Sequence, residues 1–171
     1  QGAVPLGEAV MENGNFEFKG SVEGVVPAYI LTAEQQLIAT LMLENKDYMV
    51  VANVLGIEVK GGGDAQRIWT QFEAIRADMM REKMKLEQEG KAAYAEQNQM
   101  KLQAINQQFE KIVKKSMDEE IKLLKLHGNS FVSAFQIASS MAGMSFEQLS
   151  ERYALLGEDA RTSPFGKMIE N

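Results

Sequence analysis

The chain has 171 residues, of which 45% are hydrophobic and 25% charged, an ordinary composition for one globular domain. Its formal net charge of −6 opposes a phosphate backbone, so the sequence predicts no nucleic-acid partner. Cysteine is absent and histidine occurs once, which excludes a disulfide, a thiolate nucleophile and a thiolate or paired-imidazole metal site within these residues. No stretch approaches the roughly 18 uncharged apolar residues of a membrane span.

Short apolar runs separated by turn residues fill the first third of the chain and predict strands. These strands cover residues 8–12, 16–22, 28–31, 37–43, 48–54 and 57–60. The stretch VMENGNFEFKGSV predicts a hairpin at Asn13-Gly14, because a type I′ turn needs positive φ at both central residues. Phe16 and Phe18 share one face of their strand, whereas LIATLML (37–43) is apolar on both faces and is expected to be central in its sheet.

Helical periodicity begins after three glycines at residues 61–63, where Asp64 is the expected N-cap of a helix. The apolar stripe falters at Gly90 and then resumes, which predicts a second helix over residues 92–126, about 50 Å long. We expect Gly128 to end this helix in the left-handed conformation and Asn129 or Ser130 to cap the next one.

Three shorter helices are expected over residues 131–142, 145–156 and 164–171. Ser145 and Gln148 have the spacing of a capping box, and Ser163-Pro164 has the form of an N-cap followed by the first helical residue. The sequence therefore predicts an α+β fold, with a small antiparallel sheet or partial sandwich followed by a helical bundle. We assign residues 1–63 to an antiparallel β subdomain and residues 64–171 to an α-helical subdomain of one structural unit.

Five local features could carry chemistry. They are the GGGD turn at residues 61–64, the single His127, the acidic run SMDEE at residues 116–120, the methionines Met79, Met80, Met84, Met141 and Met144, and the aromatic residues Trp69, Phe72 and Tyr94. The glycine turn could hold a phosphate, the histidine could act as a base, and the acidic run could supply paired carboxylates. The methionines could bind a peptide, and the aromatic residues could bind a flat ligand.

Each feature also has a structural interpretation, which we favour. The turn is then a strand-to-helix joint, the histidine a helix cap, the acids a solvated face, the methionines core filling, and the aromatic residues the means of docking a helix on the sheet. The sequence therefore predicts no catalytic, cofactor-binding or metal-ligating residue, and no enzyme activity in this chain.

Five stretches, in order, resemble a known domain family. They are VPLGEAVMENGNFEFKGSVEGVVPAYIL, LMLENKDYMVVANVLGIEVKGGG, AQRIWTQFEAI, LLKLHGNSFVSAFQIA and LLGEDARTSPFGKMIEN. Together they resemble DUF4369, a domain of unknown function that precedes a thioredoxin-like domain in many thiol:disulfide interchange lipoproteins of Gram-negative anaerobes. Two departures are the missing lipoprotein signal with its first strand pair and the missing Cys-x-x-Cys domain. Both imply truncation, and Gln1-Gly2 is then a cleavage scar or a processed start.

The resemblance implies a non-catalytic accessory domain of an envelope thiol:disulfide oxidoreductase. Such a domain would position or dimerise the thioredoxin-like domain, in the periplasm or tethered to a membrane through a lipid absent from this chain. Its expected partners are that domain, a second copy that covers an exposed sheet edge, and a protein or peptide substrate. The alternative is a periplasmic holdase or peptide-binding module with helical arms, although such holdases are basic and the capped helices after residue 128 favour a compact bundle. A hydrolase or transferase is the third class.

Overall fold

The computed structural model describes residues 3–54 and 56–170 and has an α+β fold. The strands are β1 (Val26–Leu31), β2 (Leu37–Leu43), β3 (Tyr48–Asn53) and β4 (Gly56–Gly61). The helices are α1 (Asp64–Ala95), α2 (Gln99–Leu126), α3 (Phe131–Ser140), α4 (Phe146–Ala154), α5 (Glu158–Thr162) and α6 (Pro164–Glu170), with a 3-10 turn at Met141–Gly143. Gln1-Gly2, the expected processed start, and Asn171 of the last predicted helix lie outside the described residues.

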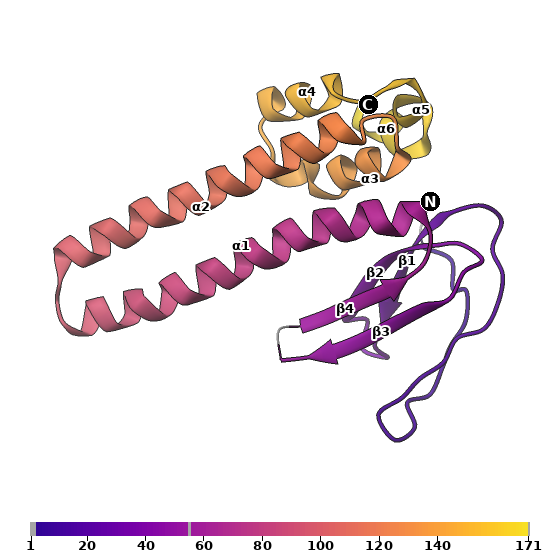
Figure 1. Ribbon diagram of the computed structural model, residues 1–171, viewed down its shortest axis with the longest axis horizontal. Helices are drawn as coiled ribbons and strands as arrows, with labels where there is room; N and C mark the ends of the chain where they lie inside the picture. Colours follow the sequence, from indigo (N-terminus) through magenta and orange to yellow (C-terminus); the bar gives the residue numbers. More distant parts are fainter. Residues whose placement is uncertain (1–2, 55, 171) are drawn as a thin grey trace.

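The two long helices form an antiparallel hairpin, and the far half of this hairpin projects away from the rest of the molecule (Figure 1). The 32 residues of α1 span about 48 Å at 1.5 Å per residue. The strands pack beside the first part of α1, and the short helices α3 to α6 gather at the end of α2. We call residues 80–112 the arm and the remainder of the described chain the body.

The four strands form two separate antiparallel pairs, β1 with β2 and β3 with β4. The prediction that β2 is central in a larger sheet is wrong, because β2 pairs along one edge only. Side chains satisfy its other edge. The Met42 N–H donates to Gln66 Oε1 (2.8 Å), the Met42 carbonyl accepts from the Tyr48 hydroxyl (2.7 Å), and the Thr40 carbonyl accepts from Trp69 Nε1 (3.0 Å). These contacts take the place of a neighbouring strand along this edge.

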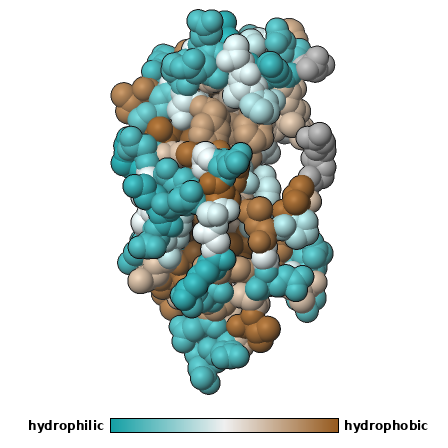
Figure 2. Space-filling view, turned by 90° about the vertical axis from the view of Figure 1, so that its right-hand side faces the viewer, coloured by the Kyte–Doolittle hydropathy of each residue, from teal (hydrophilic) through white to brown (hydrophobic). Residues whose placement is uncertain are grey.

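The predicted strands at residues 8–12 and 16–22 are not formed. Their turn is correct, since Asn13 and Gly14 have φ of 51° and 78°, and Glu12 and Asn15 exchange two backbone hydrogen bonds of 2.8 and 2.9 Å. No ladder extends beyond this bridge among the described residues. A two-stranded hairpin needs cover for its apolar face, and here Val10 and Phe18 remain 80% and 49% exposed. Figure 2 shows hydrophobic side chains among hydrophilic ones on the face of the molecule that it presents.

The break between the two long helices lies at residues 96–98, so the predicted helix over residues 92–126 is wrong at its start. Gly90 remains inside α1. The helix ends in a Schellman motif, in which the Gln97 N–H donates to the Tyr94 carbonyl and the Asn98 N–H to the Ala93 carbonyl. Gln97 takes the left-handed conformation (φ 54°) that glycine usually occupies there, so the sequence carries no glycine signal at the turn. Asn98 then caps α2 by accepting from the Lys101 N–H.

Three predicted caps are confirmed. Ser145 and Gln148 form the capping box of α4, Ser130 accepts from the Val132 N–H at the start of α3, and Ser163 accepts from the Gly166 N–H at the start of α6. Hydroxyl side chains and an early proline therefore locate these helix starts correctly from sequence alone.

Five details of the helices differ from the predictions. Asp64 is the first residue of α1 and not its N-cap, because its carboxylate pairs with Arg67 (3.2 Å) while Gly63 occupies the cap position. Gly128 does not have positive φ; a Cβ there would collide with the Leu155 carbonyl, so packing requires this glycine. Helix α3 ends at Ser140 before the 3-10 turn, α4 ends at Ala154, and α5 was not predicted.

The apolar interior is divided between the body and the arm. The body core consists of Met42, Ile68, Trp69, Phe72, Leu124, Val132, Ala134, Phe135, Ile137, Leu156, Ala160 and Ile169. The arm core consists of Leu86, Ala93 and Ile105, with Leu102, Phe109 and Ile112 packed against them. The two clusters are separate, so α1 contributes to one core near its start and to another near its end.

Candidate functional site

The GGGD turn is a tight strand-to-helix joint. Gly61 and Gly62 have φ of 84° and 77°, and a Cβ at either would collide with the Asp47 carbonyl or the Tyr48 ring. At Gly63, the N-cap of α1, the space that a Cβ would need is filled by the carboxylate of Glu44. A carboxylate against this helix start repels a phosphate, so the local charge disfavours the phosphate-binding interpretation.

His127 terminates α2, as expected of a helix-ending residue. Its Nε2 lies 2.9 Å from Gln71 Oε1, and its carbonyl accepts from the Ser130 N–H and the Ser133 hydroxyl. The ring therefore contacts an amide, which can orient it but cannot supply the nucleophile or carboxylate of a catalytic pair.

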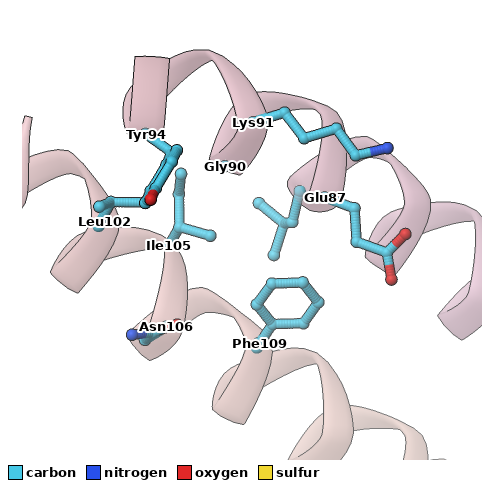
Figure 3. Close-up of a pocket in the computed structure, with 9 residues that line it drawn as sticks. Glu87, Gly90, Lys91, Tyr94, Leu102, Ile105, Asn106 and Phe109 are labelled. Atoms are coloured by element: carbon cyan, nitrogen blue, oxygen red, sulfur yellow. The ribbon is translucent and has the colours of Figure 1, made fainter. Parts of the chain in front are cut away.

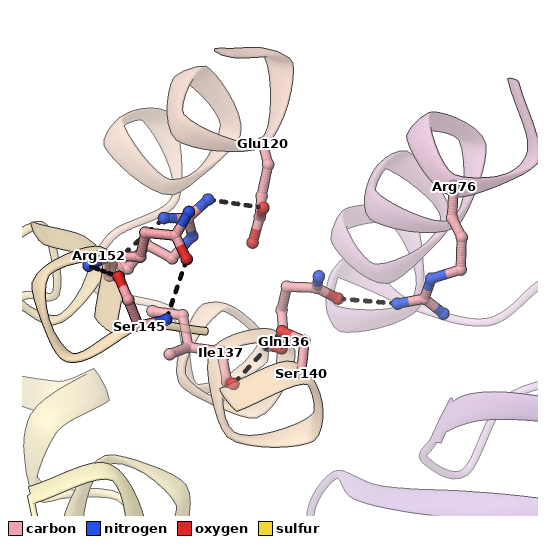
Figure 4. Close-up of polar contacts among 8 residues, drawn as sticks. Arg76, Glu120, Gln136, Ile137, Ser140, Ser145 and Arg152 are labelled. Carbon is pink, nitrogen blue, oxygen red and sulfur yellow. Dashed lines mark hydrogen bonds and ion pairs between the residues drawn. The ribbon is translucent and has the colours of Figure 1, made fainter. Parts of the chain in front are cut away.

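The acidic run at residues 116–120 does not act as a group. Glu120 turns inward and pairs with Arg152 of α4 (3.4 Å; Figure 4), with side-chain exposures of only 15% and 3%. Asp118, in contrast, is exposed. Arg152 also donates to the Gln148 carbonyl, while Arg152 Nε and Glu120 Oε1 have no partner among the described residues. The sequence did not reveal this pair because its members lie on different helices. Its chemistry is that of a helix-to-helix tie.

The aromatic residues divide between the body and the arm. Trp69 and Phe72 are each 2% exposed, and Trp69 docks α1 on β2 as predicted. Tyr94 is 77% exposed near the end of the arm. The prediction that the methionines fill the core is wrong for Met80 and Met84, which are 54% and 58% exposed on the arm.

Two charged side chains border the body core near Trp69. Burial raises the pKa of Glu73, although the guanidinium of Arg76 lies 2.6 Å from its carboxylate and acts in the opposite direction. Arg76 also stacks over the Trp69 ring at 5.7 Å and donates to Gln136 Oε1 (3.3 Å; Figure 4). These contacts hold α1 against α3.

An open apolar groove of about 450 Å³ lies between α1 and α2 near the end of the arm (Figure 3). Its lining is Leu86, Glu87, Gly90, Lys91 and Tyr94 of α1 with Leu102, Ile105, Asn106 and Phe109 of α2. Tyr94 and Leu102 lie at one end and Glu87 and Phe109 at the other. Such a lining suits an apolar side chain of a protein partner, oriented by the charges at the edge.

A missing side chain explains why the groove exists. Phe72, Met79, Leu86 and Ala93 recur every seven residues along α1, and Gly90 lies between the last two at the spacing of an inward-facing position. A Cβ at Gly90 would meet nothing within 4 Å, so neither backbone conformation nor close packing requires glycine there. The seven-residue spacing was the signal in the sequence, but it points to the groove only once α2 is known to return beside α1.

One family model matches the first part of the chain. Residues 1–67 match the family model of the domain of unknown function DUF4369. The DUF4369 match covers β1 to β4 and the first four residues of α1, whereas the arm and the helices α2 to α6 lie beyond it. No curated protein and no solved structure matches the chain.

The described residues also bear on metal binding and on membrane insertion. Within residues 3–54 and 56–170, no three histidine, aspartate or glutamate side chains gather into a cluster that could hold a metal ion. None of the helices described has both the length and the apolar character needed to cross a bilayer. The groove on the arm is the candidate binding site.

Proposed function

We propose that this chain is a non-catalytic accessory module of an envelope thiol:disulfide oxidoreductase. In this role it positions a thioredoxin-like domain and binds protein, including a second copy of itself, with the module in the periplasm or tethered to the outer envelope by a lipid. The match of residues 1–67 to DUF4369 carries the proposal. It is supported by the resemblance of this chain to the DUF4369 domains that precede a thioredoxin-like domain. The absence of cysteine supports it further, since any thiol chemistry must then come from outside these residues.

The architecture supports a binding role over chemistry. The described side chains bring His127 to the amide of Gln71 and Glu120 to the buried Arg152, which are contacts between helices and place no nucleophile beside either residue. In contrast, the arm presents an apolar groove and exposed methionines to solvent. Methionine side chains adapt to partners of different shape, which suits a surface that binds protein.

The experiment that tests this proposal is the mass of the native protein purified from the cells that make it, with peptide coverage on both sides of these residues. A product carrying a Cys-x-x-Cys domain whose disulfide is reduced and reoxidised in a redox titration would support the accessory role. A native product with no such domain, and no stable complex with a separate one, would contradict it.

A holdase is the second candidate, and the projecting hairpin favours it. The prediction from sequence placed the helices in a compact bundle, but the far half of α1 and α2 extends as an arm with its own small core. Suppression of aggregation of a chemically unfolded client at less than one module per client would favour the holdase. No suppression at a severalfold excess would exclude it.

A further inference from the structure

The arm carries a second line of side chains on α1, directed to solvent. Its members are Met80, Met84, Glu87, Lys91 and Tyr94, at intervals of four, three, four and three residues. This spacing places them on one face of the helix. Met84 and Tyr94 are 58% and 77% exposed, and Glu87 and Lys91 are exposed as well. We call Met84, Glu87, Lys91 and Tyr94 the outer stripe.

The outer stripe is self-complementary when its direction is reversed. Along α1 it reads apolar, acidic, basic and apolar, so an antiparallel copy brings an acid opposite a base and an apolar side chain opposite another. A two-fold axis close to residue 89 places Glu87 opposite Lys91 of the second copy and Met84 opposite its Tyr94. Methionine sulfur and aromatic rings attract each other, and the pair of Glu87 with Lys91 occurs twice by symmetry.

The two charges are available for such pairing. Glu87 and Lys91 are four residues apart in the order that allows a pair within one helix, yet neither forms an ion pair with any described residue. Figure 3 shows both side chains extending from α1 at the edge of the groove.

We infer that a second copy of this chain docks on the outer stripe, with the two α1 helices antiparallel and the two arms overlapping at their tips. The axis is six residues from the end of α1 at Ala95, so the two bodies lie at opposite ends of the assembly and do not collide. This inference deepens the proposed function by locating its second copy.

The contact is small, because only about three turns of one helix overlap, and three turns bury less than the ~800 Å² per partner of a standard stable interface. We therefore expect a reversible dimer, formed by mass action between micromolar and millimolar concentrations. Sedimentation equilibrium across that range measures its dissociation constant.

Charge reversal tests the pairing. Glu87→Lys places four lysines at the axis and Lys91→Glu places four glutamates there, so each variant alone is expected to dimerise about tenfold more weakly or worse. An equimolar mixture of the two variants restores opposite charges and is expected to form a heterodimer at least as stable as the wild-type dimer. Lys85→Glu on the opposite flank of α1 and Glu151→Lys on α4 make the same charge changes on exposed side chains outside the stripe and should leave dimerisation unchanged.

Disulfide capture tests the position of the axis. The chain has no cysteine, so a cysteine introduced at residue 88, beside the axis, can form a disulfide only with the same residue of a second copy. Gln88→Cys is expected to give a covalent dimer on mild oxidation, whereas Lys85→Cys is expected to stay monomeric.

Three results would overturn the inference. They are a wild-type monomer at millimolar concentration, a dimer that both charge reversals leave unchanged, and equal capture at residues 85 and 88. The second result would assign the dimer to another surface, such as the sheet edge. Each leaves the native-product test of the accessory role unaffected, because that test does not depend on self-association.

Discussion

The body and the arm share the helix α1 but are stabilised differently. Near its start, Ile68, Trp69 and Phe72 are covered by β2, α3 and neighbouring helices, so α1 is buried over a wide face. Beyond Met79 the same helix contacts α2 through one line of residues, and Leu86 and Ala93 are its only buried side chains there among the described residues. A wide buried face gives a rigid core element, and a single line of contact leaves the other faces free to bind.

The difference teaches that one continuous helix can hold a core together and also present a surface to a partner. The inward-facing pattern changes accordingly, from apolar residues on a broad face at residues 68–75 to Met79, Leu86 and Ala93 at intervals of seven residues. Four substitutions test this division, from the largest expected effect to the smallest.

Trp69→Ala removes the side chain that joins α1, β2 and Phe135. Its ring contacts Phe135 edge-on at 5.2 Å, and its Nε1 donates to the Thr40 carbonyl. We expect the free energy of unfolding, measured in urea, to fall by about 3–5 kcal/mol, and trypsin to cleave the body and the arm alike. A loss under about 1 kcal/mol would show that the body does not depend on this contact.

Leu86→Ala removes the largest buried side chain that α1 contributes to the arm core. The expected loss is about 2 kcal/mol, at the low end for leucine, because the narrow arm can collapse around the cavity. Limited trypsin digestion should now cleave faster within residues 80–112 while the body remains resistant. Equal acceleration throughout would mean that the arm and the body unfold as one unit.

Gly90→Ala should stabilise the arm. The position is helical, and the added Cβ meets no atom within 4 Å, so alanine gains helix propensity at no steric cost. We expect the free energy of unfolding to rise by about 0.5–1 kcal/mol, detected as an increase in Tm. A decrease would contradict the open space assigned to Gly90.

Glu73→Gln tests the edge of the body core through pH. Burial raises the pKa of Glu73, so the folded state holds more protons than the unfolded state just above the ordinary glutamate value, and wild-type stability falls as pH rises through that window. The variant is therefore expected to be more stable than wild type at pH 7, by less than about 1 kcal/mol since the side chain is 42% exposed, and equal to it near pH 3. A variant less stable at pH 7 would show that the pair with Arg76 dominates.

The sequence predicted features that depend on neighbours along the chain. The turn at Asn13-Gly14, the strands β1 to β4 and the caps at Ser130, Ser145 and Ser163 follow from local backbone chemistry. The prediction of strands on either side of that turn is wrong, because two strands pair stably only when another part of the protein covers their apolar face. Local pattern cannot supply that information.

Neither the end of α1 nor the groove could be predicted from local sequence signals. Gln97 adopts a conformation typical of glycine, while the glycine nearby, Gly90, stays helical, so the usual signal pointed to the wrong residue. The buried pair of Glu120 and Arg152 and the groove beside Gly90 each depend on side chains from two helices. Such sites become visible only when the packing of the helices is known.

Amide hydrogen exchange of the wild-type protein tests the central claim most directly, because it measures the opening free energy of each segment. The division into body and arm predicts that amides of residues 80–112 exchange through local openings whose free energy is well below the global free energy of unfolding. Amides at Trp69, Phe72 and residues 132–137 should then exchange only through global unfolding. One common opening free energy for both regions would contradict a separately stabilised arm.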